Sequence, residues 1–282
     1  MNDQADRLRE MVLDVPPPTG VAEENPRPLL VVSGGSAGVG TTTLTIELAS
    51  DFTRHGKRRV LLVDANFSRP ALATRCGRVE RGTLCDVLAG RRTVNEVLLR
   101  GPDGVQIVPG GRWEGQTIEQ THGRLLDQLR RLRDSADLVI VDAGKGCGET
   151  VQLFWQVATT ILLVTTPDPD AILHGYAAIK AAAKRAAPEK ICVVANRVDR
   201  DRPDDGQIQQ RIRQACHQFL GAAIDAGPSV PVGTFVERPG HVSSSPPLGR
   251  RNASSALKVR ALAEHLTRRL GLPGRPGGLL IE

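Results

Sequence analysis

A glycine-rich stretch between Ser33 and Thr43 contains the residues best suited to hold a phosphate group. It follows an apolar run and leads into a helical pattern. Gly35, Gly40 and Thr42 match the motif G-x-x-x-x-G-K-[ST], whose glycines let backbone N–H groups face a phosphate and whose hydroxyl binds Mg²⁺. An ordinary glycine-rich turn is the alternative. We predict a phosphate site formed by Gly35, Ser36, Gly38, Val39, Gly40, Thr41, Thr42 and Thr43.

The motif lacks its lysine, because Thr41 stands in that position. A lysine there places a positive charge on the β- and γ-phosphates as charge develops during phosphoryl transfer. Thr41 offers only a hydroxyl. We therefore expect binding to persist through the backbone amides, while hydrolysis is slow or absent.

Three further polar residues follow apolar runs. Asp64 and Asp142 end two of these runs, and Asn196 with Arg197 ends a third. Carboxylate oxygens suit Mg²⁺, and a base edge can be read by an amide. Either Asp could instead cap a helix, and Asn196 could be an ordinary turn residue. Beside a phosphate loop, we predict Thr42, Asp64 and Asp142 as metal ligands and Asn196 and Arg197 as nucleotide contacts.

Short apolar runs alternate with longer helical patterns along the chain, which predicts a doubly wound, mostly parallel α/β sheet flanked by helices. Ligands of such sheets bind at the carboxyl ends of the strands. The predicted strands are 29–32, 60–63, 105–108, 138–141, 161–164, 191–195 and 232–236. The predicted helices are 3–14, 42–55, 118–133, 149–157, 171–186, 207–220 and 254–270.

The 282 residues divide by composition into four segments. An N-terminal helix at 1–14 is followed by a proline-rich linker at 15–28, the α/β domain at 29–272 and a flexible tail at 273–282. No apolar run approaches the roughly 18 residues of a membrane span, and the charged N-terminus does not read as a signal peptide. We therefore expect a cytoplasmic protein.

The remaining composition excludes some kinds of site. The five cysteines and six histidines show neither disulfide nor zinc spacing. A net charge of +6 permits contact with anionic lipid or nucleic acid, but no basic cluster marks a nucleic-acid site.

Taken together, these motifs resemble the MinD/ParA family of deviant Walker ATPases across about residues 29–270. The family loop reads G-K-G-G-V-G-K-[ST], so Ser36 and Thr41 replace both of its lysines. Asn66 replaces the second acidic residue of the family's D-x-D motif, which is thought to assist the attacking water. The resemblance implies ATP and Mg²⁺ as cofactors, an ATP-dependent homodimer, Asp142 as Walker B residue, and Asp64, Asn66 and Asp142 as the catalytic positions.

Within the family, the chain is most similar to the flagellar number regulators called FlhG, FleN or YlxH. Segments 164–171 and 176–180 resemble V-T-T-P-E-P-T-A and Y-A-x-I-K of that subfamily, and the N-terminus resembles its D-Q-A-x-x-L-R element. In the subfamily this element docks on the GTPase FlhF and stimulates it. The resemblance implies a partner contact through Asp3, Gln4, Ala5, Leu8 and Arg9; a helix that packs on its own domain is the alternative.

Other interpretations stay open. The chain could be a pseudo-ATPase scaffold, a ParA-like partitioning ATPase, or a relative of polysaccharide-associated tyrosine kinases, which 66–70 and 84–90 resemble although the tail lacks tyrosines. Lys145 could approach the phosphates or be a solvated loop residue.

The last predicted helix has an apolar stripe that permits two interpretations. The stripe could contact the inner face of the plasma membrane, as amphipathic helices do, or pack on the sheet, which we favour. It consists of Val259, Leu262, Ala263, Leu266 and Leu270.

Overall fold

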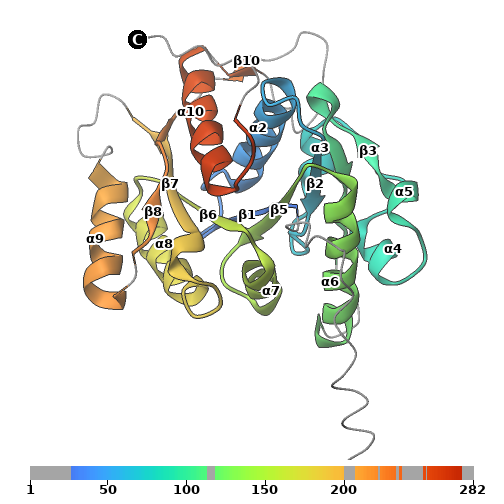
Figure 1. The fold of residues 1–282 in the computed structure, drawn as a ribbon, viewed down its shortest axis with the longest axis horizontal. Helices are drawn as coiled ribbons and strands as arrows, with labels where there is room; N and C mark the ends of the chain where they lie inside the picture. The colour runs from blue at the N-terminus through green and yellow to red at the C-terminus, as the bar shows by residue number, and fades with distance from the viewer. Residues whose placement is uncertain are drawn as a thin grey trace, which may run out of the picture.

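The computed structural model describes residues 27–274 except 113–117, 200–206, 222, 233–234, 237–249 and 252. A central sheet lies between two layers of helices, as predicted (Figure 1). Among the described residues, the strands follow the order β3-β4-β2-β5-β1-β6-β7-β8, and β9 also pairs with β7. All of these pairs are parallel except β3 with β4. The predicted helix at 3–14 and most of the linker lie outside the described residues.

The long strands are those that the continuous apolar runs predicted. The strands are β1 Leu29–Gly34, β2 Val60–Asp64, β3 Leu99–Arg100, β4 Gln106–Val108, β5 Leu138–Lys145, β6 Thr160–Thr165, β7 Ile191–Val198, β8 Asp225–Ala226 and β9 Val230–Pro231. Apart from the central sheet, β10 Phe235–Val236 and β11 Arg250–Arg251 form a separate antiparallel pair.

Helices cover both faces of the sheet. They are α2 Thr41–Arg54, α3 Leu72–Arg75, α4 Leu84–Leu88, α5 Val94–Val97, α6 Ile118–Ser135, α7 Glu149–Val157, α8 Pro169–Ala182, α9 Ile208–Leu220 and α10 Ala253–Arg269, with 3₁₀ turns at Pro102–Gly104 and Pro188–Lys190. In Figure 1, α2 and α10 lie on one face, and α6, α7, α8 and α9 lie on the other.

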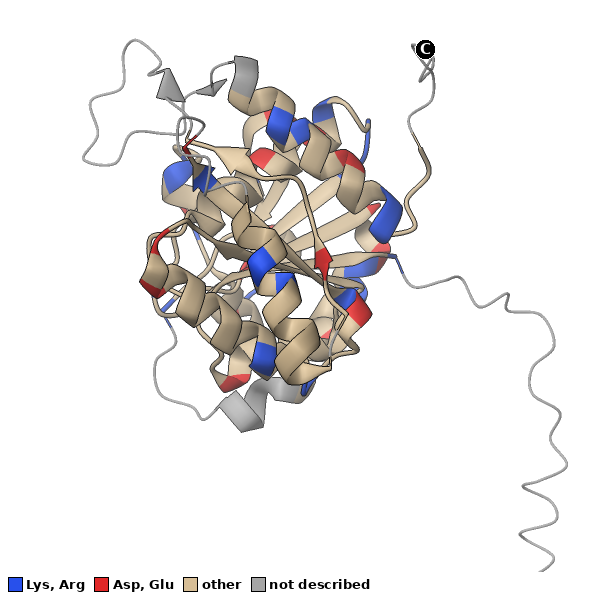
Figure 2. Ribbon diagram, turned by 90° about the vertical axis from the view of Figure 1, so that its left-hand side faces the viewer, with Lys and Arg blue, Asp and Glu red and all other residues tan. Residues whose placement is uncertain are grey.

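The strands alternate their side chains between two apolar cores. In β1, Leu29 and Val31 belong to the core under α7 and α8, whereas Leu30 and Val32 belong to the core under α2 and α10. All four side chains are 0% exposed. Burial on both faces explains why the strand sequences are continuously apolar rather than alternating. Figure 2 shows the complementary pattern, with Lys and Arg distributed over the surrounding helices and loops.

Several predicted boundaries differ from the structure; among them, the helix predicted at 171–186 ends at Ala182, and the strands predicted at 138–141 and 191–195 extend to Lys145 and Val198. The run at 232–236 is not one strand, because β9 ends at Pro231, Val232 is in no strand, and β10 begins at Phe235. A proline ends β9, and a glycine follows Val232 in the sequence, so neither neighbour favours continued pairing. The helix predicted at 171–186 begins at Pro169, because Asp168 caps it by accepting hydrogen bonds from the N–H groups of Asp170 and Ala171 at 3.0 and 3.1 Å.

The apolar stripe of α10 packs inside the molecule, which is the interpretation that we favoured. Its five members are at most 5% exposed, and they belong to the core shared with α2. Arg260 adds a 3.7 Å ion pair to Asp51 of α2. No helix among the described residues is long and apolar enough to cross a membrane.

Candidate phosphate-binding site

The glycine-rich loop joins the end of β1 to the start of α2 at the carboxyl edge of the sheet. Gly38 and Gly40 adopt φ angles of 83° and 91°, a left-handed conformation that favours glycine. The first turn of α2 contains no acidic residue, and no side chain among the described residues caps it at Gly40. The N–H groups and positive dipole end of α2 are therefore available to an anion.

Asp142 lies almost completely buried near the end of β5, with 1% of its surface exposed. Its Oδ1 accepts a 3.0 Å hydrogen bond from the N–H of Gly144, while its buried Oδ2 has no hydrogen-bond partner among the described residues. Burial raises the pKa of Asp142, and the Thr42 hydroxyl, the Gly144 N–H and the Arg75 charge partly oppose that rise. An unpartnered carboxylate oxygen beside Thr42 is a suitable ligand for a cation.

Asp64 is equally buried but is engaged differently. Its Oδ2 accepts hydrogen bonds from the N–H groups of Ala71 and Leu72 at 2.8 and 2.9 Å, and its Oδ1 accepts one from Asn66 at 3.2 Å. Burial and the nearby Asp142 raise the pKa of Asp64 to about 7, against the lowering effect of these N–H groups. The carboxylate thus fixes the start of α3 to the end of β2.

Asn66 forms a tight turn directly after β2. Its Oδ1 accepts hydrogen bonds from Ser68 Oγ at 3.0 Å and from the N–H of Arg69 at 3.3 Å. The side chain lies against Gly144, where a Cβ atom would be 2.5 Å from the Asn66 amide carbon. Asn66 therefore lies against the turn that follows Asp142.

Asn196 reaches across from β7 to the phosphate loop. Its Nδ2 donates a 2.8 Å hydrogen bond to the Val39 carbonyl, while its buried Oδ1 has no partner among the described residues. A Cβ atom on Gly40 would lie only 2.4 Å from this Nδ2, so the loop and Asn196 are mutually fitted. Arg197 follows with a φ of 60°, where β7 bulges against β9.

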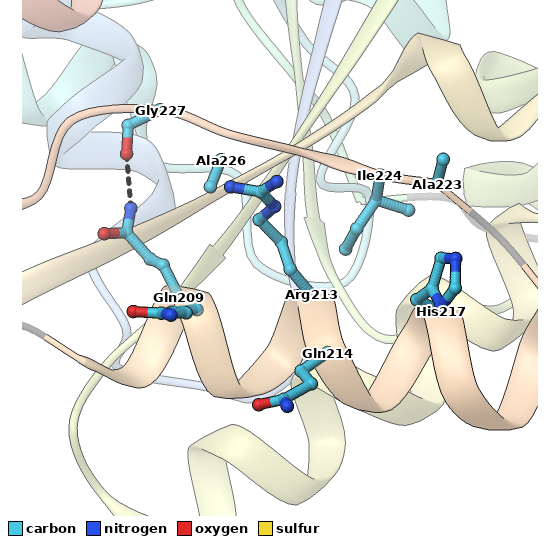
Figure 3. A pocket seen from close by; sticks show the side chains of 9 residues that line it. Gln209, Arg213, Gln214, His217, Ala223, Ile224, Ala226 and Gly227 are labelled. Atoms are coloured by element: carbon cyan, nitrogen blue, oxygen red, sulfur yellow. Dashed lines mark hydrogen bonds between the residues drawn. The ribbon is translucent and has the colours of Figure 1, made fainter.

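A hollow of about 820 Å³ opens beside the loop, between Ser36–Val39 and the start of α8. Arg197 and Asp199 complete its wall on the side of β7, and Asp168, Asp170 and His174 on the side of α8. A second hollow of about 600 Å³ lies at the sheet edge between α9 and β8, where Arg213 and His217 face Ile224 (Figure 3). None of the predicted site residues lines this second hollow.

The comparisons with known proteins agree with this geometry. The family model described as the CobQ/CobB/MinD/ParA nucleotide binding domain matches residues 30–231. The chain belongs to this family. The resemblance to the MinD/ParA family that was stated from the sequence is thereby confirmed.

Individual relatives of this nucleotide-binding family cover most of the chain. The antiactivator FleN of Pseudomonas aeruginosa is 28% identical over 91% of this chain and 91% of its own length. The flagellum site-determining protein YlxH of Helicobacter pylori is 27% identical over 70% of this chain and 67% of its own. The solved structure of the septum site-determining protein MinD with Mg-ADP from Pyrococcus horikoshii has a TM-score of 0.65 at 21% identity, covering 86% and 97% of the two chains.

The predicted residues fit a nucleotide and a magnesium ion. The loop glycines leave an open cradle at Gly38, where no atom lies within 4 Å of an added Cβ, and Asp142 Oδ2 is an orphaned oxygen in a buried place. Thr42 lies next to that carboxylate. The fit is poorer for Asp64, because three N–H groups already occupy its oxygens. Asp3, Gln4, Ala5, Leu8 and Arg9 lie outside the described residues.

Several residues near the site were not singled out from the sequence. Asp168 lines the hollow, and the pattern Asp-Pro before a helix could have identified it as a cap. Arg75 approaches the loop from α3, and no sequence signal marks it, because a four-residue helix has too little periodicity. Lys145, which the sequence did indicate, is exposed and pairs in register with Gly34 of β1.

A cluster at the other end of the strands has ligand-type residues that the spacing did not indicate. Cys192, Asp225 and His265 bring one ligand atom each within 4.8 Å of the others. Asp225 Oδ2 is, however, 2.5 Å from His265 Nε2 and 2.9 Å from Arg269 Nη1. Burial raises the pKa of Asp225, but the contacts with His265 and the charge of Arg269 outweigh this effect and leave the pKa lowered. The cluster therefore fastens α10 to β8 as an ion-pair network.

Proposed function

We propose that this chain is a nucleotide-binding regulator of flagellar placement or number, with ATP and Mg²⁺ as its ligands and with slow or absent hydrolysis. The similarity to FleN and YlxH over most of their lengths supports the regulatory role. The family supports the nucleotide, and a MinD relative that was solved with Mg-ADP supports the metal. The proposed nucleotide domain extends over residues 29–272, between the segments 1–28 and 273–282.

The observation that carries the nucleotide site is the pairing of an uncapped α2 N-terminus with the orphaned Asp142 Oδ2. In the proposed complex, the loop N–H groups bind phosphate oxygens. Thr42 and Asp142 would hold Mg²⁺, which would supply positive charge beside the phosphates. Asn196 Oδ1 accepts a hydrogen bond from the base, since its Nδ2 is already donated to Val39. Asp64 does not contact the ligand in this complex; it holds the start of α3 in place through the N–H groups of Ala71 and Leu72.

Slow hydrolysis follows from three replaced groups. Thr41 and Ser36 cannot place a positive charge on the phosphates, and the amide of Asn66 cannot accept a proton from an attacking water as a carboxylate can. Loss of one preorganised electrostatic group typically costs about 10²–10³ in rate. A pseudo-ATPase that has lost nucleotide binding as well is the second candidate, and the absence of any basic residue from 33 to 53 favours it.

The proposed partner is an FlhF-type GTPase, contacted by Asp3, Gln4, Ala5, Leu8 and Arg9. A positioned amide can orient water, and a guanidinium can neutralise phosphate charge, in another protein's nucleotide site. We include an ATP-dependent homodimer and a cytoplasmic location in the proposal. Membrane contact through the α10 stripe finds no support in the packing, because that stripe is buried.

Calorimetric titration of the full chain with ATP, with and without Mg²⁺, tests the proposed ligands. We expect saturable binding that Mg²⁺ strengthens, and we expect Asp142→Asn to remove most of the Mg²⁺ effect. An absence of binding at millimolar ATP in both conditions would favour the pseudo-ATPase scaffold. Thermal unfolding of each variant without nucleotide shows whether the fold persists.

A further inference from the structure

The phosphate loop needs a positive charge that its own segment does not contain. From Ser33 to Thr53 the sequence has no Lys or Arg, and the first basic residue of α2 is Arg54 at its far end. A nucleotide triphosphate brings several negative charges to this place. Backbone N–H groups and one divalent ion leave part of that charge uncompensated, so a cation from another element would strengthen binding.

Arg75 is a basic side chain of another element that reaches the first turn of α2. It is the last residue of α3, and its Nη1 lies 3.5 Å from Thr43 Oγ1, at the outer limit of a hydrogen bond. Thr43 belongs to the first turn of α2, whose N–H groups point to the proposed phosphates.

The position of α3 is fixed by Asp64. The carboxylate accepts the N–H groups of Ala71 and Leu72 at the start of this helix, and the Leu72 side chain is 0% exposed in the core under α2. The N–H of Arg75 closes the short helix on the Ala71 carbonyl at 2.9 Å. The buried carboxylate of Asp64 thus holds the start of α3, and Arg75 is the last residue of this helix.

Arg75 has no competing ion pair among the described residues. Among the other arginines, Arg54 pairs with Asp103 and Arg91 pairs with Asp86. Two other cations, Lys145 and Arg197, lie near the loop. Lys145 pairs through its backbone with Gly34, and no hydrogen bond from its side chain to the loop is found in the described part of the chain. Arg197 approaches the loop from β7, where its Nε would lie 3.9 Å from a Cβ atom on Gly40, and it lines the 820 Å³ hollow with Val39.

We propose that Arg75 contacts a phosphate oxygen of the bound nucleotide and replaces in space the loop lysine that is absent at Thr41. This inference rests on the proposed nucleotide binding and names a further residue of the same site. The guanidinium offers several N–H donors in a planar fork, which suits phosphate oxygens. Asp64, Leu72 and α3 then act as its positioning elements. Arg75 thus supplies, from an element outside the loop, the positive charge that a loop lysine would contribute to binding.

The test compares Arg75→Gln with Arg78→Gln in the full chain. Arg78 is an exposed arginine three residues further on, so its variant has the same change in net charge without the contact to α2. Calorimetry gives the dissociation constants for Mg-ATP and for Mg-ADP. We expect Arg75→Gln to weaken ATP binding about ten- to a hundredfold, the usual effect of losing a hydrogen bond to a charged group, and Arg78→Gln to change it less than about twofold.

A second variant separates a charge effect from a structural one. Thr41→Lys combined with Arg75→Gln should restore most of the lost affinity, because the lysine returns a charge to the loop without repairing α3. If Arg75→Gln bound ATP as tightly as the wild type, the role of Arg75 would be overturned while the nucleotide site stayed intact. A wild type that binds no nucleotide would overturn the proposed function itself, and this inference with it. Failure of Thr41→Lys to restore affinity would contradict replacement of the lysine by Arg75.

Discussion

Asp64 and Asp142 are register partners on the neighbouring parallel strands β2 and β5, and each is only 1% exposed. They nevertheless have different surroundings. The oxygens of Asp64 accept three backbone N–H groups, whereas Oδ2 of Asp142 remains without a partner in the described part of the chain. Two acids that look equivalent in the sequence therefore differ in the structure: Asp64 holds the start of α3, and we propose Asp142 as the better cation ligand.

The anchoring role predicts a particular pH dependence. Because the pKa of Asp64 is raised to about 7 from 3.8, the folded state retains a proton that the unfolded state has released between these values. The contribution of Asp64 to the free energy of unfolding therefore falls by up to about 4 kcal/mol as pH rises from about 4 to 7. Asp64→Asn should be less stable than the wild type at pH 4, and the difference should shrink towards pH 7.

Urea unfolding of both proteins across this range, without Mg²⁺, measures the effect. Other groups titrate in both proteins, so the difference between the two curves isolates Asp64. A difference in unfolding free energy that stays constant from pH 4 to 7 would show that Asp64 is ionised throughout.

The loop glycines offer a matched pair of substitutions. Gly38 and Gly40 both have positive φ, but an added Cβ meets open space at Gly38 and lies 2.4 Å from Asn196 Nδ2 at Gly40. Gly38→Ala should cost about 1–2 kcal/mol of strain. Gly40→Ala should cost about 1–3 kcal/mol more through overpacking, and should weaken nucleotide binding by displacing Asn196. Thermal unfolding and ATP titration measure the two effects; equal behaviour of both variants would refute the close fit between Asn196 and the loop.

The buried stripe of α10 predicts a stability effect with an internal control. Leu262 is 0% exposed and Leu257 is 63% exposed on the same helix. Leu262→Ala should lower the unfolding free energy by about 2–5 kcal/mol, and Leu257→Ala by no more than about 0.5 kcal/mol. Urea unfolding gives both values. If Leu262→Ala kept full stability but lost binding to anionic vesicles, the stripe would serve the membrane rather than the core.

The N-terminal segment should be needed for partner stimulation and dispensable for nucleotide binding. Deletion of residues 1–14 should remove the stimulation of an FlhF-type GTPase, and Gln4→Ala or Arg9→Ala should reduce it, because these side chains would act inside the partner's nucleotide site. ATP affinity of the truncated chain is the control and should not change. Undiminished GTPase stimulation by the truncated chain would remove the support for a regulatory helix at 1–14.

The sequence predicted the parallel sheet and the edge at which the site lies, and the reason is physical. Strands such as β1 and β6 are buried on both faces, so they read as continuous apolar runs, and the polar residues that follow them must gather at the carboxyl edge. The arrangement of Thr42, Asp142 and Asn196 around the loop is consistent with that reasoning.

The segment after Asn66 could not be predicted in the same way. Its helices α3, α4 and α5 have four or five residues each, which is too short for a periodic pattern. Their positions depend on hydrogen bonds between distant groups, such as Asp64 to Leu72. The proximity of Arg75 to Thr43 follows from that contact and has no local signature. The sequence also cannot show that the carboxylate oxygens of Asp64 accept hydrogen bonds from N–H groups, since Asp64 and Asp142 both stand at the end of an apolar run.

The most direct measurement of the proposed site is single-turnover phosphate release from bound Mg-ATP by the wild type and by Thr41→Lys. Restoring the lysine supplies the charge that develops during transfer, while the loop, Thr42 and Asp142 stay unchanged. We predict that both proteins bind ATP and that the wild type releases phosphate about 10²–10³-fold more slowly. A wild-type rate equal to or above that of Thr41→Lys would contradict the conclusion that the missing lysine limits hydrolysis at this site.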